Sequence, residues 1–151
     1  MKMQNPKASK TKEKPISVIK VGVIGYSSGD FKEVAAKAYI NDAFNLVEKH
    51  YGKEVKFKLF SGLTNMGIPK LAYENATDRG WETVGIAPRC AEEYEHFPCD
   101  LVKFVGQNWG DESDYFISSI HLLIKVGGGK QSEAEKQLAI ERGLYIMDYD
   151  L

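Results

Sequence analysis

The segment that decides the fold reads Ile124-Lys125-Val126-Gly127-Gly128-Gly129-Lys130-Gln131-Ser132-Glu133-Ala134-Glu135. Its apolar start is typical of a buried strand, and its polar end is typical of a surface helix. The glycines between them permit a positive φ and let a ligand approach the backbone closely. The helix directs its free N–H groups, and the positive end of its dipole, back at this loop. The segment therefore predicts a strand–loop–helix unit that binds an anion, most commonly a phosphate.

Outward from this segment, strand patterns and helix patterns alternate along the chain. The expected strands cover 16–24, 55–60, 81–87, 101–105, 120–126 and 144–147. The expected helices cover 31–51, 69–79, 111–119 and 132–142, and Asp30 is the expected N-cap of the first. This alternation predicts a single α/β domain, a three-layer α/β/α sandwich with a mainly parallel, Rossmann-like sheet. The domain is expected to span 16–151, after a disordered basic tail at 1–15.

Composition narrows the class of protein. The chain has 151 residues, of which 43% are hydrophobic and 27% charged, as in ordinary globular domains. A net charge of −1 gives no reason to expect a nucleic-acid partner. No apolar run approaches the roughly 20 residues of a membrane span, and no signal-peptide pattern is present, so a cytoplasmic protein without a membrane partner is expected.

The potential metal ligands do not form a recognisable motif. Cys90 and Cys99 have neither metal nor redox spacing and are interpreted as reduced thiols. The acidic stretch 92–100 contains carboxylates and a histidine, but its irregular spacing favours a flexible surface loop over a metal site. We therefore expect no metal and no resident cofactor.

Three loops are rich in glycine and hydroxylated residues, at 25–30, 61–67 and 127–132. Each precedes a helix, and in parallel sheets ligands bind beyond the carboxyl ends of the strands, where the strand order reverses. The alternative, glycines that serve only as tight turns, does not explain the hydroxyls. The sequence thus predicts one nucleotide pocket, with these candidate ligand-binding residues: Gly25, Ser27, Ser28, Gly62, Thr64, Asn65, Arg89, Gly127, Gly128, Gly129, Lys130, Gln131 and Ser132.

Several motifs resemble those of the SLOG superfamily, which includes the LOG ("lonely guy") proteins, often mislabelled as lysine decarboxylases. Gly85-Ile86-Ala87-Pro88 resembles the Gly-Ile-x-Pro end of the family's third strand, and Met66-Gly67 resembles the end of its glycine-rich loop. Gly25-Tyr26-Ser27-Ser28-Gly29 is similar to its Gly-Ser-Ser phosphate loop. The segment 127–135 resembles Pro-Gly-Gly-x-Gly-Thr-x-x-Glu, with Gly127 for Pro, Gln131 for the third Gly, Ser132 for Thr, and Glu135 on the motif's Glu.

The resemblance implies a nucleotide-binding protein that forms a homodimer or a higher homo-oligomer. It also implies, for the LOG enzymes, cleavage of the N-glycosidic bond of nucleoside 5′-monophosphates. In that reaction Glu135 would be the catalytic carboxylate that stabilises the oxocarbenium-like state, and Ser132 with the glycine amides would hold the phosphate. The residues alone leave an alternative open, in which Glu135 is a solvent-exposed helix residue paired with its neighbours.

One departure from the LOG pattern separates binding from catalysis. Active LOG proteins carry an arginine in a Met-x-x-Arg-Lys context on the helix before the glycine-rich strand, whereas 111–119 contains neither Arg nor Lys. This favours a module that binds a nucleotide or nucleotide-derived ligand as a sensor, carrier or sequestering protein. The alternatives are a LOG-like phosphoribohydrolase and a carrier of the molybdenum cofactor, since carriers of that kind are related to the superfamily.

Other polar and aromatic residues have two interpretations each. In one interpretation, Asp111, Glu112 and Asp114 contact a ribose, a base or a cation at the rim of the cleft. In the other, they form a charged first turn that satisfies the helix dipole. Trp109 stacks on a base or anchors the rim. Arg89 and Lys130 are candidate phosphate cations or plain surface charges.

Overall fold

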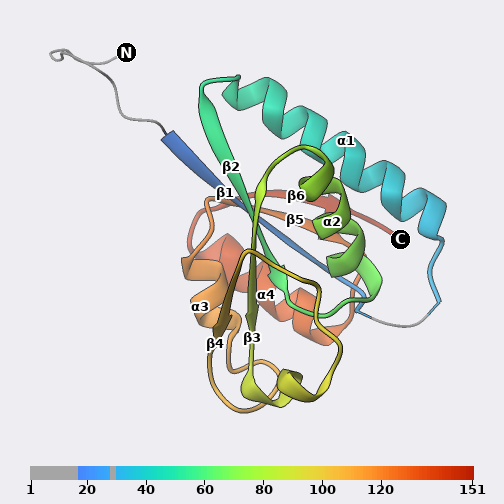
Figure 1. Ribbon diagram of the computed structural model, residues 1–151, viewed down its shortest axis with the longest axis vertical. Coiled ribbons are helices and arrows are strands. Elements are labelled where there is room, and N and C mark those ends of the chain that lie inside the picture. Colours follow the sequence, from blue (N-terminus) through green and yellow to red (C-terminus); the bar gives the residue numbers. More distant parts are fainter. Residues whose placement is uncertain (1–16, 28–29) are drawn as a thin grey trace, which may run out of the picture.

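The computed structural model describes residues 17–27 and 30–151 (Figure 1). Six parallel strands form one sheet, in the order β4-β3-β2-β1-β5-β6. The strands are β1 (Ser17–Gly25), β2 (Val55–Gly62), β3 (Glu82–Ala87), β4 (Leu101–Phe104), β5 (Leu122–Val126) and β6 (Tyr145–Tyr149). The helices are α1 (Glu33–Tyr51), α2 (Gly67–Asp78), α3 (Ser113–Ser118) and α4 (Lys130–Glu141), with a short 3₁₀ helix η1 (Arg89–Glu93). The predicted single α/β domain with a parallel sheet is confirmed.

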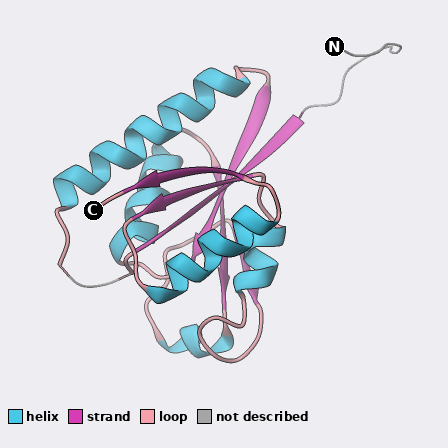
Figure 2. Cartoon of the chain, turned by 180° about the vertical axis from the view of Figure 1, so that it is seen from behind, coloured by secondary structure: helices cyan, strands magenta, loops and turns pink. Residues whose placement is uncertain are grey.

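Helices cover both faces of the sheet because its central strands are apolar on both. Val21 and Val23 of β1 pack under α1 and α2, in the core that also contains Phe44. Ile24 of the same strand points the other way, into the core beneath α3 and α4 with Phe116. Figure 2, seen from behind, brings α3 and α4 in front of the sheet. The layers therefore follow from the alternation of side chains along β1.

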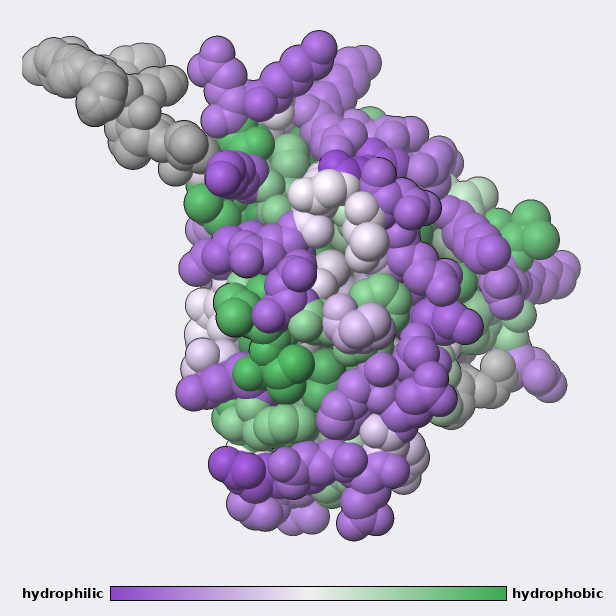
Figure 3. Space-filling view, in the orientation of Figure 1, coloured by the Kyte–Doolittle hydropathy of each residue, from purple (hydrophilic) through white to green (hydrophobic). Residues whose placement is uncertain are grey.

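The edge strand β4 exposes apolar side chains to solvent. Leu101 is 54% exposed and Val102 is 47% exposed, although both lie in a strand. Figure 3 shows apolar surface gathered on the side of the molecule where Figure 1 places β3 and β4. None of the helices in the described ranges is long and apolar enough to cross a membrane.

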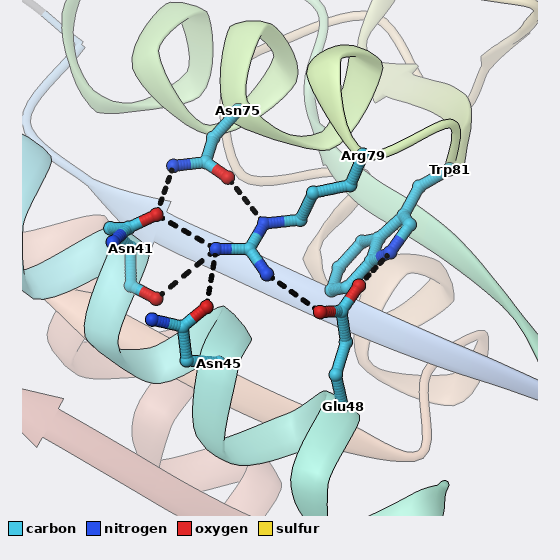
Figure 4. A network of polar contacts seen from close by, with 6 residues as sticks. All are labelled: Asn41, Asn45, Glu48, Asn75, Arg79 and Trp81. Atoms are coloured by element: carbon cyan, nitrogen blue, oxygen red, sulfur yellow. Dashed lines mark hydrogen bonds and ion pairs between the residues drawn. The ribbon is translucent and has the colours of Figure 1, made fainter. Parts of the chain in front are cut away.

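A polar network joins α1, α2 and the start of β3 (Figure 4). The Arg79 guanidinium donates to Glu48 Oε1 at 2.8 Å and to Asn45 Oδ1 at 2.9 Å. Asn75 and Asn41 accept further hydrogen bonds from the same group. The indole N–H of Trp81 donates to the second oxygen of Glu48 at 3.0 Å. This network, called the Arg79 network below, lies at the edge where the strands begin.

Some expectations about local structure are wrong. Asp30 is not the N-cap: α1 begins at Glu33, and Lys32 occupies the N-cap position without a side-chain cap. The chain stays extended past Asp30 because Phe31 stacks on Tyr26, with ring centroids 6.2 Å apart, before the helix starts. The predicted loop at 92–100 begins inside η1, which no apolar periodicity announces. The predicted tail at 1–15 lies outside the described residues.

The strand order places one reversal between β1 and β5. From β1 the chain moves outward through β2, β3 and β4, and it then returns to pair β5 with the other side of β1. In such sheets the loops on the two sides of the reversal separate and leave a crevice beyond the carboxyl ends of the strands. The loops after β1 and β5 are two of the three loops that the sequence singled out.

Candidate ligand-binding site

A cavity of about 340 Å³ lies at this reversal, beyond the carboxyl ends of the central strands. Its walls come from the loops after β1, β2 and β5, the first turns of α4, and the start of α3. The three glycine- and hydroxyl-rich loops therefore meet around one space. The candidate residues that line it are Gly25, Ser27, Gly62, Thr64, Gly129, Lys130, Gln131, Ser132 and Glu135.

The other candidates lie outside this lining. Asn65 is engaged with Glu95: its side-chain amide donates to the carboxylate at 2.7 Å, and its backbone N–H donates to the carbonyl at 3.0 Å. Arg89 is exposed at the start of η1. Gly127 and Gly128 shape the turn behind the cavity, and Ser28 falls outside the described residues. Ligand contacts by these residues stay predictions.

Two glycines hold the loops at their close approach. Gly67 has φ +66°, and a Cβ added there would lie 2.3 Å from the carbonyl oxygen of Tyr26. That carbonyl accepts a 2.7 Å hydrogen bond from the N–H of Ile68, which fastens the loop after β1 to the first turn of α2. Gly128 has φ +115°, and a Cβ there would lie 2.4 Å from the hydroxyl of Ser132. A side chain at either position would move a wall of the cavity.

The first turn of α4 offers hydrogen-bond donors to the cavity. Gly129 occupies the N-cap position and contributes no side-chain cap. The first bond inside the helix runs from Glu133 N to Gly129 O at 3.1 Å, so the amides of residues 130–132 have no intrahelical acceptor. The hydroxyls of Ser132 and Thr64 also line the cavity; these residues are 6% and 7% exposed, and neither hydroxyl has a hydrogen-bond partner among the described residues.

The opposite wall is acidic. Glu112 and Glu135 are each 6% exposed, so the alternative of a solvent-exposed Glu135 is wrong. The Gln131 side-chain amide bridges the two carboxylates, donating to Glu112 Oε2 at 2.8 Å and to Glu135 Oε2 at 3.2 Å. Ser113 donates to the same oxygen of Glu135 at 2.7 Å, and Gly110 N donates to Glu112 Oε1 at 3.0 Å. We call Glu112, Gln131 and Glu135 the acidic wall.

Burial sets the protonation of this wall. Loss of water raises the pKa of Glu135 above its ordinary value, the hydrogen bonds from Ser113 and Gln131 oppose that rise, and repulsion from Glu112 adds to it.

Basic side chains are scarce around the cavity. Among the described lining residues only Lys130 is basic, and it is exposed. Lys125 is buried nearby in β5, but it pairs with Glu133 at 2.9 Å and does not line the cavity.

The three acids at the start of α3 have different positions, which the sequence did not distinguish. Asp111 is exposed, and its carboxylate accepts the N–H groups of Asn108 and Gln107, which lowers its pKa. Asp114 pairs with Arg142 on the surface. Glu112 alone of the three turns into the cavity. For Asp111 and Asp114 the structure favours the interpretation as a turn cap and a surface pair.

Trp109 lies at the mouth of the cavity and is 49% exposed. Its ring meets Tyr94 edge-on, with centroids 5.7 Å apart. Ser61, from the predicted loop at 61–67, also lines the cavity, although it was not among the candidate ligand-binding residues. Ile86 and Phe116 line it too and were not predicted, because their apolar sequence context gave no sign of a role beyond the core. Cys90 and Cys99 are both free, and the described residues contain no cluster of three or more His, Cys, Asp or Glu able to hold a metal.

Comparison with known proteins identifies the fold. No protein-family profile matches the sequence, and no curated protein matches it. Among solved structures, the structural-genomics target TM1055 is similar with a TM-score of 0.67 and 19% identity, over 85% of this chain and 72% of that one. A molybdenum cofactor (Moco) carrier protein from Chlamydomonas reinhardtii is similar with a TM-score of 0.68 and 21% identity, over 88% and 77%. A molybdenum cofactor binding protein from Rippkaea orientalis gives 0.67 and 17%, over 91% and 78%. At these identities the likeness establishes that the chain shares the Rossmann-like fold of these proteins.

Proposed function

We propose that the chain binds a nucleotide or a nucleotide-derived ligand in this cavity and acts as a sensor, carrier or sequestering module of SLOG type. The observation that carries the proposal is the set of unused donors at the strand reversal. The hydroxyls of Thr64 and Ser132 are buried without a described partner, and the α4 amides face the same space. An unsatisfied buried hydroxyl costs about 1–3 kcal/mol, and a phosphate oxygen that accepts from it removes that cost. Phosphate accepts from all of these groups.

The size and the mouth of the cavity suit a small planar ligand that carries one phosphate. A volume of about 340 Å³ falls in the range of roughly 300–1,000 Å³ for small-molecule sites. The exposed ring of Trp109 offers a face on which a base can stack. With Lys130 as the one cation among the described lining residues, backbone amides supply most of the anion binding, and this favours a monophosphate over a triphosphate.

A panel of nucleoside monophosphates tests this proposal by thermal shift and calorimetry. We expect at least one to raise the melting temperature at millimolar concentration. Ser132→Ala is expected to weaken its binding about tenfold, because one hydroxyl bond to an anion is lost. Thr77→Ala removes an exposed hydroxyl on α2 away from the cavity and serves as the matched control. If no nucleotide stabilises the protein, the proposal is wrong.

The second candidate is a LOG-like phosphoribohydrolase, and the position of Glu135 favours it. This carboxyl is buried, lines the cavity and has a raised pKa, as a catalytic carboxyl often does. Against it stands the absence of Arg and Lys from α3. Release of free base from a nucleoside monophosphate, lost in Glu135→Gln, would establish the hydrolase. Binding without release supports the binding module.

A third candidate is carriage of the molybdenum cofactor. It rests on the names of two of the similar structures, a Moco carrier protein and a molybdenum cofactor binding protein. Competition between this cofactor and the nucleoside monophosphates in the same calorimetric assay tests it. Displacement of the nucleotide by stoichiometric cofactor would support carriage, and no displacement would exclude it from this cavity.

We also propose a homodimer or a higher homo-oligomer. Exposed apolar residues at the β4 edge, Leu101 and Val102, supply surface that association would cover. Sedimentation velocity of the full chain tests this. A single species at the monomer mass at micromolar concentration would contradict it.

A further inference from the structure

The acidic wall is not explained by phosphate binding. A phosphate repels carboxylates, yet Glu112 and Glu135 lie in the same cavity as the α4 amides and are both buried. Neither forms an ion pair with a basic side chain of the described residues. Buried charges without a counter-charge are costly, and a ligand group that pairs with them recovers part of that cost. The wall therefore faces a part of the ligand that differs from its phosphate.

The donors around the wall are too few for its acceptors. Two carboxylates offer about eight lone-pair positions, and each oxygen accepts readily from one or two donors. Gln131 and Ser113 both donate to Glu135 Oε2, and no described residue donates to its Oε1. The buried hydroxyls of Thr64 and Ser132 are likewise without described partners in this cavity. The cavity therefore holds buried acceptors at the wall as well as the donors at the first turn of α4.

The neighbours of the wall are apolar and suit a flat ring. Ile86 and Phe116 line the cavity and are 2% and 3% exposed. Phe116 lies one turn along α3 from Glu112, since its N–H donates to the Glu112 carbonyl at 2.9 Å. A hydroxyl-covered sugar would bury polar groups against these side chains, whereas the face of a heterocycle would not.

Geometry along α4 separates the two ends of the ligand. Glu135 is five residues beyond the first residue of the helix, which corresponds to about 7.5 Å along the axis at roughly 1.5 Å per residue. The amides of the first turn and the Glu135 carboxylate thus lie on one helix, at different distances from its start, and Glu112 reaches the same wall from the N-cap position of α3. A ligand that spans both carries its anion at one end and hydrogen-bond donors at the other.

We infer that the acidic wall recognises a heterocycle that bears an exocyclic amino group, through hydrogen bonds from that group to Glu112 and Glu135. This inference rests on the proposed function and adds the class of ligand: an amino-substituted base or related bicyclic ring with a single phosphate, in preference to analogues that lack the amino group. The bridging amide of Gln131 holds the two carboxylates in position for it.

Two pairs of probes differ by one amino group each. Guanosine and inosine 5′-monophosphate differ at C2 of the base, and adenosine and purine-riboside 5′-monophosphate differ at C6. Calorimetry on the full chain is expected to show at least a tenfold preference for the amino-bearing member of one pair, because a hydrogen bond to a charged group is lost in the other. Ribose 5-phosphate, which lacks a base, measures the phosphate end alone.

Substitutions in the acidic wall test whether it is the source of the preference for amino-bearing nucleotides. Glu112→Gln and Glu135→Gln replace an acceptor oxygen with an N–H donor at nearly constant shape. Each is expected to reduce the amino preference to less than threefold while the affinity for ribose 5-phosphate stays the same or increases. Glu141→Gln makes the same chemical change on exposed α4 surface outside the cavity lining and is expected to leave both quantities unchanged.

The outcomes separate this inference from the proposed function. If nucleotides bind but the members of both pairs differ by less than twofold, the inference is wrong and the proposed function stands. If neither nucleotides nor ribose 5-phosphate bind, both are wrong. If Mg²⁺ or Mn²⁺ alone raises the melting temperature and Glu112→Gln abolishes that rise, the carboxylates hold a cation and the inference is overturned.

Discussion

The Arg79 network and the acidic wall lie at opposite edges of one sheet, and they differ in whether their charged groups find partners within the protein. In the Arg79 network the guanidinium lies against Glu48, and asparagine oxygens and the Trp81 indole complete the remaining hydrogen bonds. In the acidic wall two buried carboxylates share the amide of Gln131, and none of the described ion pairs reaches them. One network is complete within the described residues, and the other is not.

This difference separates a structural role from a binding role. A network that satisfies its own charges, such as the partly exposed Arg79 network, fixes the packing of α1 against α2 and needs no ligand. A buried network that leaves acceptors open costs free energy in the empty protein, and a ligand with matching donors recovers it. Substitutions at the first edge should therefore change stability, and substitutions at the second should change binding.

The largest expected effect is at the complete network. Arg79→Met leaves Glu48 and three asparagines without their shared charged donor, and we expect a loss of about 2–3 kcal/mol in the free energy of unfolding. Urea unfolding measures it. Lys37→Met breaks the exposed pair with Glu33, whose side chains are 59% and 63% exposed, and should cost less than about 0.5 kcal/mol. Equal effects of the two variants would contradict a structural role for the network.

The next effect concerns the glycine that supports the cavity wall. Gly67→Ala combines a positive φ with a contact of 2.3 Å to the Tyr26 carbonyl, and we expect about 2 kcal/mol of destabilisation beyond the control together with loss of nucleotide affinity. The control is Gly52→Ala, where φ is +83° and nothing lies within 4 Å of the added Cβ. Because both glycines have a positive φ, the difference in unfolding free energy between the two variants cancels the cost of φ and leaves the cost of the contact. If both variants bind nucleotide equally well, the loop after β1 does not form part of the site.

Glu135→Gln tests whether the wall is costly in the empty protein. Burial raises the pKa of Glu135, so the folded state favours its protonated form. That contribution to stability is present below the unfolded pKa, near 4.5, and is lost as pH rises through the raised folded value. The melting temperature of the variant should therefore increase relative to that of the wild type as the pH rises above about 4.5, until Glu135 is ionised in the folded protein as well. A difference that stays constant with pH would mean that Glu135 is not destabilised by its burial.

The sequence predicted the parts of the site that depend on one element and its loop. The glycine run and Ser132 place donors at a helix start by local spacing alone, and the strand alternation places that start at a sheet edge. The sequence did not pair Glu112 with Glu135, because α3 and α4 are brought together by packing beneath the sheet. It also aligned Gln131 with a glycine of the family motif, where a bridging amide has no counterpart. Local signals thus placed hydrogen-bond donors at the start of α4 and named the three residues of the acidic wall separately, but they did not predict that these residues form one wall.

The smallest expected effect concerns the only basic side chain among the described lining residues. Lys130 is exposed at the start of α4, so its attraction for a phosphate is screened by solvent and salt. Lys130→Met should weaken nucleoside monophosphate binding about threefold at low ionic strength and less at 0.5 M salt, without a change in stability. Lys49→Met, on exposed α1 surface near the Arg79 network, should change neither. A loss of a hundredfold or more would mean that this lysine, rather than the backbone amides, supplies most of the phosphate affinity.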